Sequence, residues 1–271
     1  MAQGIFDVIL KERGITSVTC SSCGLCAFGG DCVSPEAVEA AKKYSADISS
    51  HRSRPLTQYI ADETDWFVCM TCSHAAALKS AFKDKKITIL GSGVSDPYAQ
   101  PQAVYDECAA QIKSALDILA DVVTMQISPF DQSFVDGIER VERDCFSSPW
   151  SREGIEQELS NETALFLVAH SGDKVIGYIG VHEVAGEAYI ANVAVLGEYR
   201  QNGVASELLS SAEKGAADRG CEFISLEVRQ SNEPAISLYK KRGYTVRGER
   251  KNFYSNPTED ALIMTLDLKK E

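Results

Sequence analysis

The segment Tyr199–Gly220, YRQNGVASELLSSAEKGAADRG, decides the fold of the second half of the chain. The residues before it, EAYIANVAV at 187–195, predict a strand, and residues 203–219 predict a helix. Gly203 allows a close approach of the backbone where this helix begins. The first N–H groups of a helix have no partner within it and lie at the positive end of its dipole. The segment therefore predicts a cradle for an anion such as a pyrophosphate.

Arg200, Gly203 and Ala205 form the short pattern RxxGxA within this segment. It is neither the GxxxxGK(S/T) loop nor the GxGxxG fingerprint, which argues against ATP and NAD as ligands. Taken alone, the pattern is equally consistent with an ordinary turn that opens a helix.

Strands and a few helices surround this segment. The predicted strands are 122–128, 164–170, 174–184, 187–195, 223–228, 244–254 and 261–268. The predicted helices are 131–145, 151–160, 203–219 and 233–242. Runs of strands with a few helices favour an α+β domain around a mixed sheet, and we assign it to residues 122–271.

The first half of the chain alternates helices with strands. The predicted helices are 4–13, a helix that opens at Ser34-Pro35-Glu36, 73–82 and 102–119, and the predicted strands are 17–22, 65–72 and 86–91. Such alternation favours a parallel α/β sheet with helices on both faces. We assign this domain to residues 1–121.

Length and composition agree with two domains. The chain has 271 residues, of which 24% are charged and 44% hydrophobic, so each half is long enough for its own core and disorder is excluded. No apolar run approaches a membrane span, and the N-terminal stretch lacks the unbroken apolar run of a signal peptide. We therefore expect a cytoplasmic protein without a membrane partner. The net charge of −12 argues against a nucleic-acid partner, which requires clustered Lys and Arg.

Five of the nine cysteines raise the question of a metal site. Cys20, Cys23 and Cys26, followed by Cys69 and Cys72, show the CxxC spacing of zinc ligands. The first run also suits a strand entering a glycine turn, and the second a buried strand in which cysteine is a small hydrophobe. Because no signal peptide is found, we expect reduced thiols and no metal.

Four further pieces of the second half complete a resemblance. They are CFSSPWS at 145–151, LEVRQSN at 226–232, AISLYKKRGY at 235–244 and NFYSNPTEDALIM at 252–264. With the RxxGxA helix, in this order, they resemble the GNAT acetyltransferase superfamily over 123–271, and within it the RimI-type ribosomal-protein-alanine N-acetyltransferases. The resemblance implies a GNAT mixed-sheet domain with acetyl-CoA as co-substrate. Ser206 departs from the family, where a basic residue is common, and so removes one phosphate contact.

The resemblance also implies roles for individual residues. Glu227 is implied to be the general base and Tyr239 the general acid. The residues implied to bind acetyl-CoA are Val193, Ala194 and Val195 through their backbone, Gln201, Asn202, Gly203, Val204, Ala205 and Ser206 around the pyrophosphate, and Asn232.

Each role has a simpler structural alternative. Glu227 also suits the solvated end of a strand, and Tyr239 a core position with its hydroxyl satisfied locally. Asn232, before Glu233-Pro234, is equally a helix cap. Trp150 either lines a peptide groove, as the resemblance implies, or anchors the turn between two helices.

The chemistry of acetyl transfer to an amine is modest. An α-amine has a pKa of about 7.7–8.0, so one carboxylate, directly or through water, can deprotonate it near pH 7. The departing CoA thiolate needs a proton, which a phenol can donate. We therefore expect direct attack in a ternary complex, and the RimI resemblance implies the N-terminal alanine of ribosomal protein number eighteen of the small subunit as acceptor. The alternatives are a GNAT enzyme for another protein N-terminus or small amine, or a phosphatase-like binding or regulatory module fused to it.

The first half resembles a second family. SPEAVEAAKKYSADISSHRSRPLT at 34–57, DWFVCMTCSHAAAL at 65–78 and SDPY at 95–98 resemble low-molecular-weight protein tyrosine phosphatases over most of residues 1–120. That family needs a cysteine nucleophile in a CxxxxxR loop, and none of the nine cysteines has an arginine six positions downstream. Asp96 falls where the family keeps its general acid, but without a nucleophile we expect a turn residue and no phosphatase activity.

Two explanations account for a phosphatase-like half without its first strand and loop. Either it is a truncated domain that serves as a scaffold, or translation begins upstream of Met1. The in-frame nucleotide sequence before Met1 distinguishes them.

Overall fold

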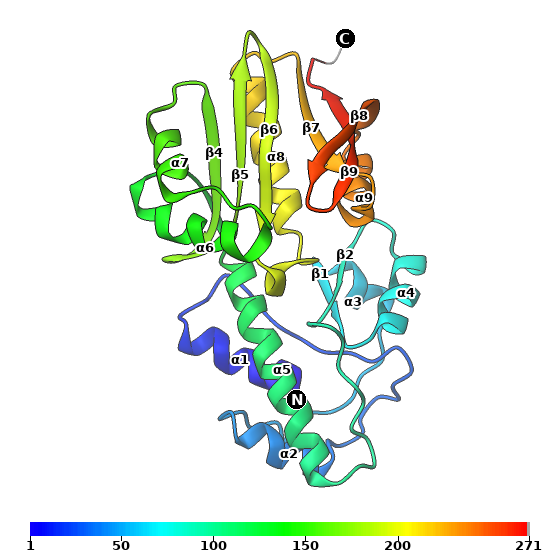
Figure 1. The fold of residues 1–271 in the computed structure, drawn as a ribbon. Helices are drawn as coiled ribbons and strands as arrows, with labels where there is room; N and C mark the ends of the chain where they lie inside the picture. Colours follow the sequence, from blue (N-terminus) through cyan, green and yellow to red (C-terminus); the bar gives the residue numbers. More distant parts are fainter. Residues whose placement is uncertain (270–271) are drawn as a thin grey trace. The chain divides into compact units, whose positions relative to one another are not determined.

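The computed structural model describes residues 1–269 (Figure 1). Residue contacts divide the chain into two compact units, Met1–Thr124 and Met125–Glu271. The last helix of the first unit ends at Val123. The domain boundary expected between residues 121 and 122 therefore lies within the last turn of this helix.

The first unit combines helices with a small parallel sheet. Its helices are α1 (Ala2–Glu12), α2 (Pro35–Lys42), α3 (Gln58–Asp62), α4 (Cys72–Ala81) and α5 (Gln102–Val123), and its strands are β1 (Trp66–Cys69) and β2 (Lys86–Ile89). The two strands pair in parallel, with Trp66 opposite Lys86, which confirms the predicted α/β class. Ser34 caps α2 as predicted, because its hydroxyl accepts the N–H of Ala37 at 3.3 Å.

The core of this unit lies mainly between α1, α2 and α5. Ile5, Ile9, Ala40, Ala109 and Ile112 are at most 3% exposed. Buried residues recur at helical spacing in α1 and α5, and in α2 Ala37 and Ala41 are buried beside Ala40, so each helix turns one apolar face inward.

One predicted strand of the first half is wrong, and the first predicted strand of the second half begins four residues late. Residues 17–22 form no strand, and the backbone there is held by a side chain, because Arg54 Nε donates to the carbonyl of Ser22 at 2.7 Å. The strand predicted at 122–128 begins only at Gln126, because Val122 and Val123 continue α5. Periodicity cannot separate a strand from a buried helix end over so short an apolar run. Helix α3 was not predicted.

The second unit is built on a seven-stranded sheet in the order β3-β4-β5-β6-β7-β9-β8. The strands are β3 (Gln126–Pro129), β4 (Ala164–Ser171), β5 (Lys174–Val184), β6 (Glu187–Val195), β7 (Phe223–Arg229), β8 (Thr245–Ser255) and β9 (Thr258–Asp267). Strands β6 and β7 pair in parallel, and the other neighbours pair antiparallel. The predicted mixed sheet is confirmed.

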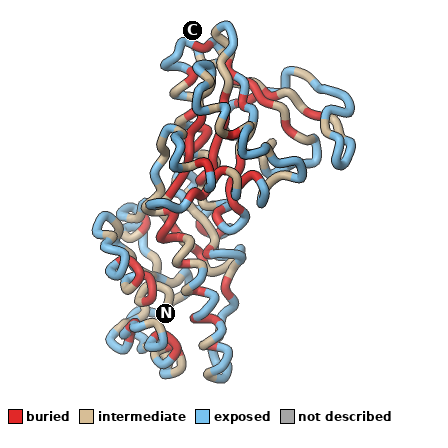
Figure 2. Tube along the Cα trace, turned by 60° about the vertical axis from the view of Figure 1, so that its left-hand side comes forward, coloured by how far each residue is buried: buried red, intermediate tan, exposed pale blue. Residues whose placement is uncertain are grey.

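Helices cover both faces of this sheet. They are α6 (Val135–Cys145), α7 (Arg152–Gln157), α8 (Val204–Asp218) and α9 (Glu233–Lys241), with 3-10 turns at Gln132–Phe134, Glu158–Ser160 and Gly197–Tyr199. Helix α8 packs against Leu165, since a Cβ atom at Gly215 would lie 2.7 Å from that side chain. Leu165 is opposite Val181, whereas Tyr178, three residues away on β5, contacts α6 through Glu142. Because side chains alternate along a strand, α6 and α8 lie on opposite faces. Figure 2 shows the buried residues following the strands of the sheet.

Candidate active site

The sheet opens between β6 and β7. These parallel strands pair only where Ala188–Ile190 meet Ile224–Leu226. Beyond this point β6 continues to Val195 beside β5, and β7 continues to Arg229 beside β9. Residues 193–195 of β6 are therefore not paired with β7, although the carbonyl of Val195 already accepts from Arg200 Nε at 3.0 Å and from the thiol of Cys145 at 3.5 Å.

A β-bulge marks the start of this opening. On β5, Gly180 is opposite Asn192 and Val181 is opposite Ile190, which leaves Ala191 as the extra residue of β6. Bulges bend a strand and re-aim its side chains. Val193, Ala194 and Val195 follow the bulge, and Gly177 approaches them so closely that a Cβ atom there would lie 2.5 Å from the carbonyl oxygen of Ala194.

The loop that is predicted to form the anion cradle leads directly into α8. Gln201 and Gly203 adopt positive φ angles of 63° and 93°, and Gly203 is the N-cap residue. No side chain caps this 15-residue helix. The N–H groups of its first turn therefore remain available to an anion at the positive end of the dipole.

Ser206, in the first turn of α8, has a basic neighbour from another segment. Arg242 Nη1 donates to Ser206 Oγ at 3.1 Å, and Arg242 Nε donates to Glu213 Oε1 at 2.8 Å. A second bond joins Arg242 Nη2 to the other oxygen of Glu213. Position 206 carries no basic side chain, but the guanidinium of Arg242 lies beside it. The carboxylate of Glu213 balances the charge of Arg242.

Glu227 lies near the end of β7, with its side chain 25% exposed. Arg250 Nη2 lies 3.3 Å from its carboxylate, and the hydroxyl of Tyr254 donates to its backbone carbonyl at 3.2 Å. The guanidinium of Arg229 lies 4.1 Å from the centre of the Tyr254 ring. Glu227 is therefore a partly shielded carboxylate among aromatic and basic side chains rather than a freely solvated one.

Tyr239, on α9, is 8% exposed, and its ring centre lies 5.6 Å from that of Tyr244. Burial, with a smaller effect of nearby Tyr254, raises the pKa of Tyr239 to about 12. Among residues 1–269 its hydroxyl has no hydrogen-bond partner. The phenol is therefore protonated at neutral pH and unoccupied by a local acceptor.

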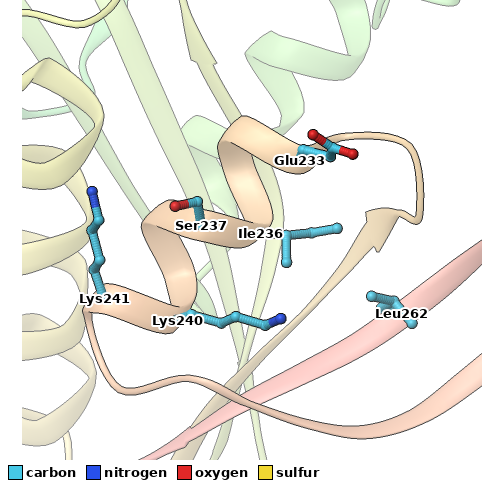
Figure 3. Close-up of a pocket in the computed structure, with 6 residues that line it drawn as sticks. All are labelled: Glu233, Ile236, Ser237, Lys240, Lys241 and Leu262. Carbon is cyan, nitrogen blue, oxygen red and sulfur yellow. The ribbon is translucent and has the colours of Figure 1, made fainter.

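Glu227 and α9 lie on opposite faces of the sheet. Leu262 of β9 lines a surface pocket of about 620 Å³ together with the α9 residues Glu233, Ile236, Ser237, Lys240 and Lys241, and Ile236 points toward it (Figure 3). Leu262 is opposite Val228, and Ile263 is opposite Glu227. Because successive side chains alternate, Glu227 projects away from α9.

The face that carries Glu227 also carries the segment 146–150 between α6 and α7. Ser225, two residues before Glu227, is opposite Tyr189, which is opposite His182. The His182 ring centre lies 5.7 Å from that of Phe166, which lies 6.0 Å from that of Trp150. The opening between β6 and β7 therefore connects the two faces of the sheet. Helices α8 and α9 lie on one face, and Glu227 and Trp150 lie on the other.

Several simpler structural roles are also seen. Asn232 caps α9, because its Oδ1 accepts the N–H of Ala235 at 3.3 Å. Asp96 Oδ1 accepts the N–H of Tyr98 at 3.0 Å, as a turn residue does. All nine cysteines are free thiols, and burial raises the pKa of Cys20 to about 11. Within residues 1–269, no group of three or more His, Cys, Asp or Glu side chains is arranged to hold a metal ion. Every helix of these residues is too short or too polar to span a bilayer.

Sequence reasoning missed Arg250 and Tyr254 beside Glu227, and Arg242 beside Ser206. The sequence predicts both C-terminal strands, the first of which ends within the stretch NFYSNP, but not their place in the sheet. Strand β9 inserts between β7 and β8, and this order brings Arg250 and Tyr254 back to Glu227. Such contacts depend on strand order, for which spacing along the chain carries no signal.

Two family models match the chain. The acetyltransferase (GNAT) family matches residues 135–244, and the low molecular weight phosphotyrosine protein phosphatase family matches residues 1–128. The first half is therefore similar to low-molecular-weight phosphatases, and the suspected resemblance of both halves is confirmed.

Individual relatives match the second half. The candidate ribosomal protein bS18-alanine N-acetyltransferase of Bacillus subtilis is 39% identical over 131 residues, which cover 48% of this chain and 87% of that protein. The Escherichia coli ribosomal protein bS18-alanine N-acetyltransferase is 28% identical over 144 residues, covering 52% and 97%. The crystal structure of the Escherichia coli ribosomal-protein-S18-alanine N-acetyltransferase matches with a TM-score of 0.51 and 28% identity, and covers 54% of this chain and 96% of that one.

Proposed function

The chain belongs to the GNAT acetyltransferase family through its second unit, and we propose that it is an N-α-acetyltransferase that moves the acetyl group of acetyl-CoA to the N-terminal alanine of ribosomal protein bS18. One observation carries the proposal: β6 and β7 diverge beside the uncapped, glycine-opened start of α8. We assign the acetyltransferase domain to 122–271 and the phosphatase-like domain to 1–121.

The residues around the opening fit acetyl-CoA. The N–H groups from Gln201 to Ser206 would surround the pyrophosphate, in a loop where Gln201 and Gly203 have positive φ angles. The backbone of Val193, Ala194 and Val195, which does not pair with β7, would hold the pantetheine arm, and an amide there would polarise the thioester carbonyl. Asn232 is proposed as a further contact of the arm beside its role as a cap.

Glu227 and Tyr239 would act on the acetyl group from opposite sides. In this mechanism Glu227, directly or through water, accepts the proton of the α-amine as the amine attacks the thioester carbon. Tyr239, protonated at neutral pH, donates a proton to the sulfur as the carbon–sulfur bond breaks. The two-sided arrangement supports direct transfer in a ternary complex, because each substrate has its own face.

The choice of acceptor rests on the relatives and on the face that carries Trp150. The test is incubation of the full chain with acetyl-CoA and an alanine-starting peptide of bS18, followed by mass spectrometry of the peptide and measurement of released thiol. We expect acetylation of the free α-amine and none of the same peptide with a blocked N-terminus. Turnover of small amines without turnover of the peptide would instead identify another acceptor class.

Gly203→Val is expected to raise the KM for acetyl-CoA by about tenfold or more with little change in kcat. A β-branched residue is strained by roughly 1–2 kcal/mol at a φ of 93°, so the cradle must rearrange before it can bind. Steady-state kinetics at varied acetyl-CoA measures the effect. Gly220→Val is the matched control, because Gly220 follows the other end of α8 at a φ of 86° with open space at its Cβ position. Equal KM values for the two variants would contradict the assignment of the cradle.

A further inference from the structure

Glu142, on α6, is a carboxylic acid with no exposed surface, and the proposed reaction does not use it. Burial of a carboxylate is costly unless hydrogen bonds replace the water it loses. A group kept under such conditions commonly holds neighbouring segments in one arrangement. Its contacts therefore indicate which segments it holds.

Three donors converge on Glu142. The hydroxyl of Tyr178 donates to Oε1, as does Asn192 Nδ2 at 3.1 Å. Asn192 Nδ2 also donates to the oxygen of Tyr178 at 3.0 Å, which closes a triangle of side chains. The backbone N–H of Trp150 donates to Oε2 at 2.6 Å. One carboxylate oxygen thus binds the sheet and the other binds the segment 146–150.

These contacts connect two parts of the side of the sheet that carries Glu227. Asn192 directly follows Ala191, the extra residue of the bulge that begins the opening of β6. Trp150 ends the segment 146–150, and its ring packs near Phe166 on the same face. Glu142 therefore bridges the strand that we assign to acetyl-CoA and the segment nearest to the acceptor's approach.

We propose that Glu142 is a positioning residue that fixes the segment 146–150 against the β6 bulge and thereby sets the affinity for the acceptor peptide. The inference rests on the proposed function, in which the acceptor approaches on this face. A carboxylate suits the task because it accepts on both oxygens. A glutamine of the same size has one accepting oxygen, so whichever way its amide faces, an NH₂ group meets either Trp150 N–H or the Tyr178–Asn192 pair.

The test compares Glu142→Gln with Glu139→Gln in the full chain. Glu139 lies one turn earlier on α6, and its side chain is 38% exposed and pairs with Arg152 at 3.1 Å. Its replacement controls for the loss of a negative charge from α6 and of a surface ion pair to α7. Both changes are made in a Trp66→Phe background, which leaves Trp150 as the single tryptophan and a reporter of the segment. For Glu142→Gln we expect stronger acrylamide quenching of Trp150. We also expect a KM for the alanine-starting peptide about tenfold higher, because a tenfold change corresponds to the loss of one charge-assisted hydrogen bond. The KM for acetyl-CoA should stay within about twofold, as expected for a change confined to the acceptor side.

Other outcomes overturn the inference. Unchanged quenching and peptide KM would show that Glu142 does not position the segment, and an equal rise in both KM values would show a general structural role. If Glu142→Gln does not fold, Tyr178→Phe decides, because it keeps the ring and removes one donor to Oε1. It should shift quenching and peptide KM in the same direction, and no shift in either overturns the proposal. Failure of the unaltered chain to acetylate the peptide refutes the proposed function separately, since quenching needs no acceptor.

Discussion

Replacing Glu227 by Gln is expected to lower kcat/KM for the alanine-starting peptide by about 100-fold at pH 7, the scale of a lost general base. The amide keeps the size of the side chain but cannot accept the amine proton. The deficit should shrink as the pH rises above about 8, because a growing share of the α-amine is then already neutral. A pH profile of kcat/KM for both proteins checks this, and the two curves should converge at high pH.

Glu249→Gln is the matched control for this experiment. Glu249 lies on β8 with its side chain 47% exposed and pairs with Lys251 rather than with the opening. It should leave the profile unchanged. If Glu227→Gln follows the parent protein at every pH, Glu227 is not the base.

Tyr239→Phe is expected to lower kcat by about 100-fold while the KM for acetyl-CoA changes little, because a general acid acts only as the bond breaks. The pKa of about 12 means that Tyr239 keeps its proton across neutral pH and loses it only near that value. The parent should therefore show no loss of this acid function between pH 6 and about pH 9. Measurement of CoA release against pH for parent and variant tests both statements.

The melting temperature of Tyr239→Phe distinguishes a catalytic role of the hydroxyl from a role in packing. Since the Tyr239 hydroxyl has no partner among residues 1–269, its removal should leave the melting temperature nearly unchanged. Tyr244→Phe is the control, because Tyr244 is buried beside Tyr239 and lies outside the proposed mechanism. A normal kcat in Tyr239→Phe, or an equal loss in Tyr244→Phe, would contradict the assignment.

The central strands could be predicted closely because their apolar runs are long and bounded by turns. The predicted strands 174–184 and 187–195 have the bounds of β5 and β6, where β5 is buried over most of its length. The start of α8 was also predictable, because Gly203 permits the positive φ that the turn requires. The predicted strand at 17–22 failed because a strand-like run needs a neighbouring strand, and this one has none among the described residues.

The surroundings of the site could not be predicted in the same way. Arg250 reaches Glu227, and Arg242 reaches Ser206, across 23 and 36 residues of chain. No sequence spacing predicts these two contacts. The first depends on the order of the strands, and the second on the packing of two helices. The sequence does not mark the bulge at Ala191 either, since residues 187–195 contain no glycine or proline.

The order of the seven strands leaves β3 and β8 at the outer borders of the sheet. Unpaired borders invite the same strand of another molecule to add on, which is how many proteins begin to form fibrils. Here β3 is four residues long and ends in Pro129, and β8 carries Arg247, Glu249, Arg250 and Lys251. Proline cannot donate to an added strand, and charges resist burial between stacked copies. The sheet is thereby protected against self-templated growth.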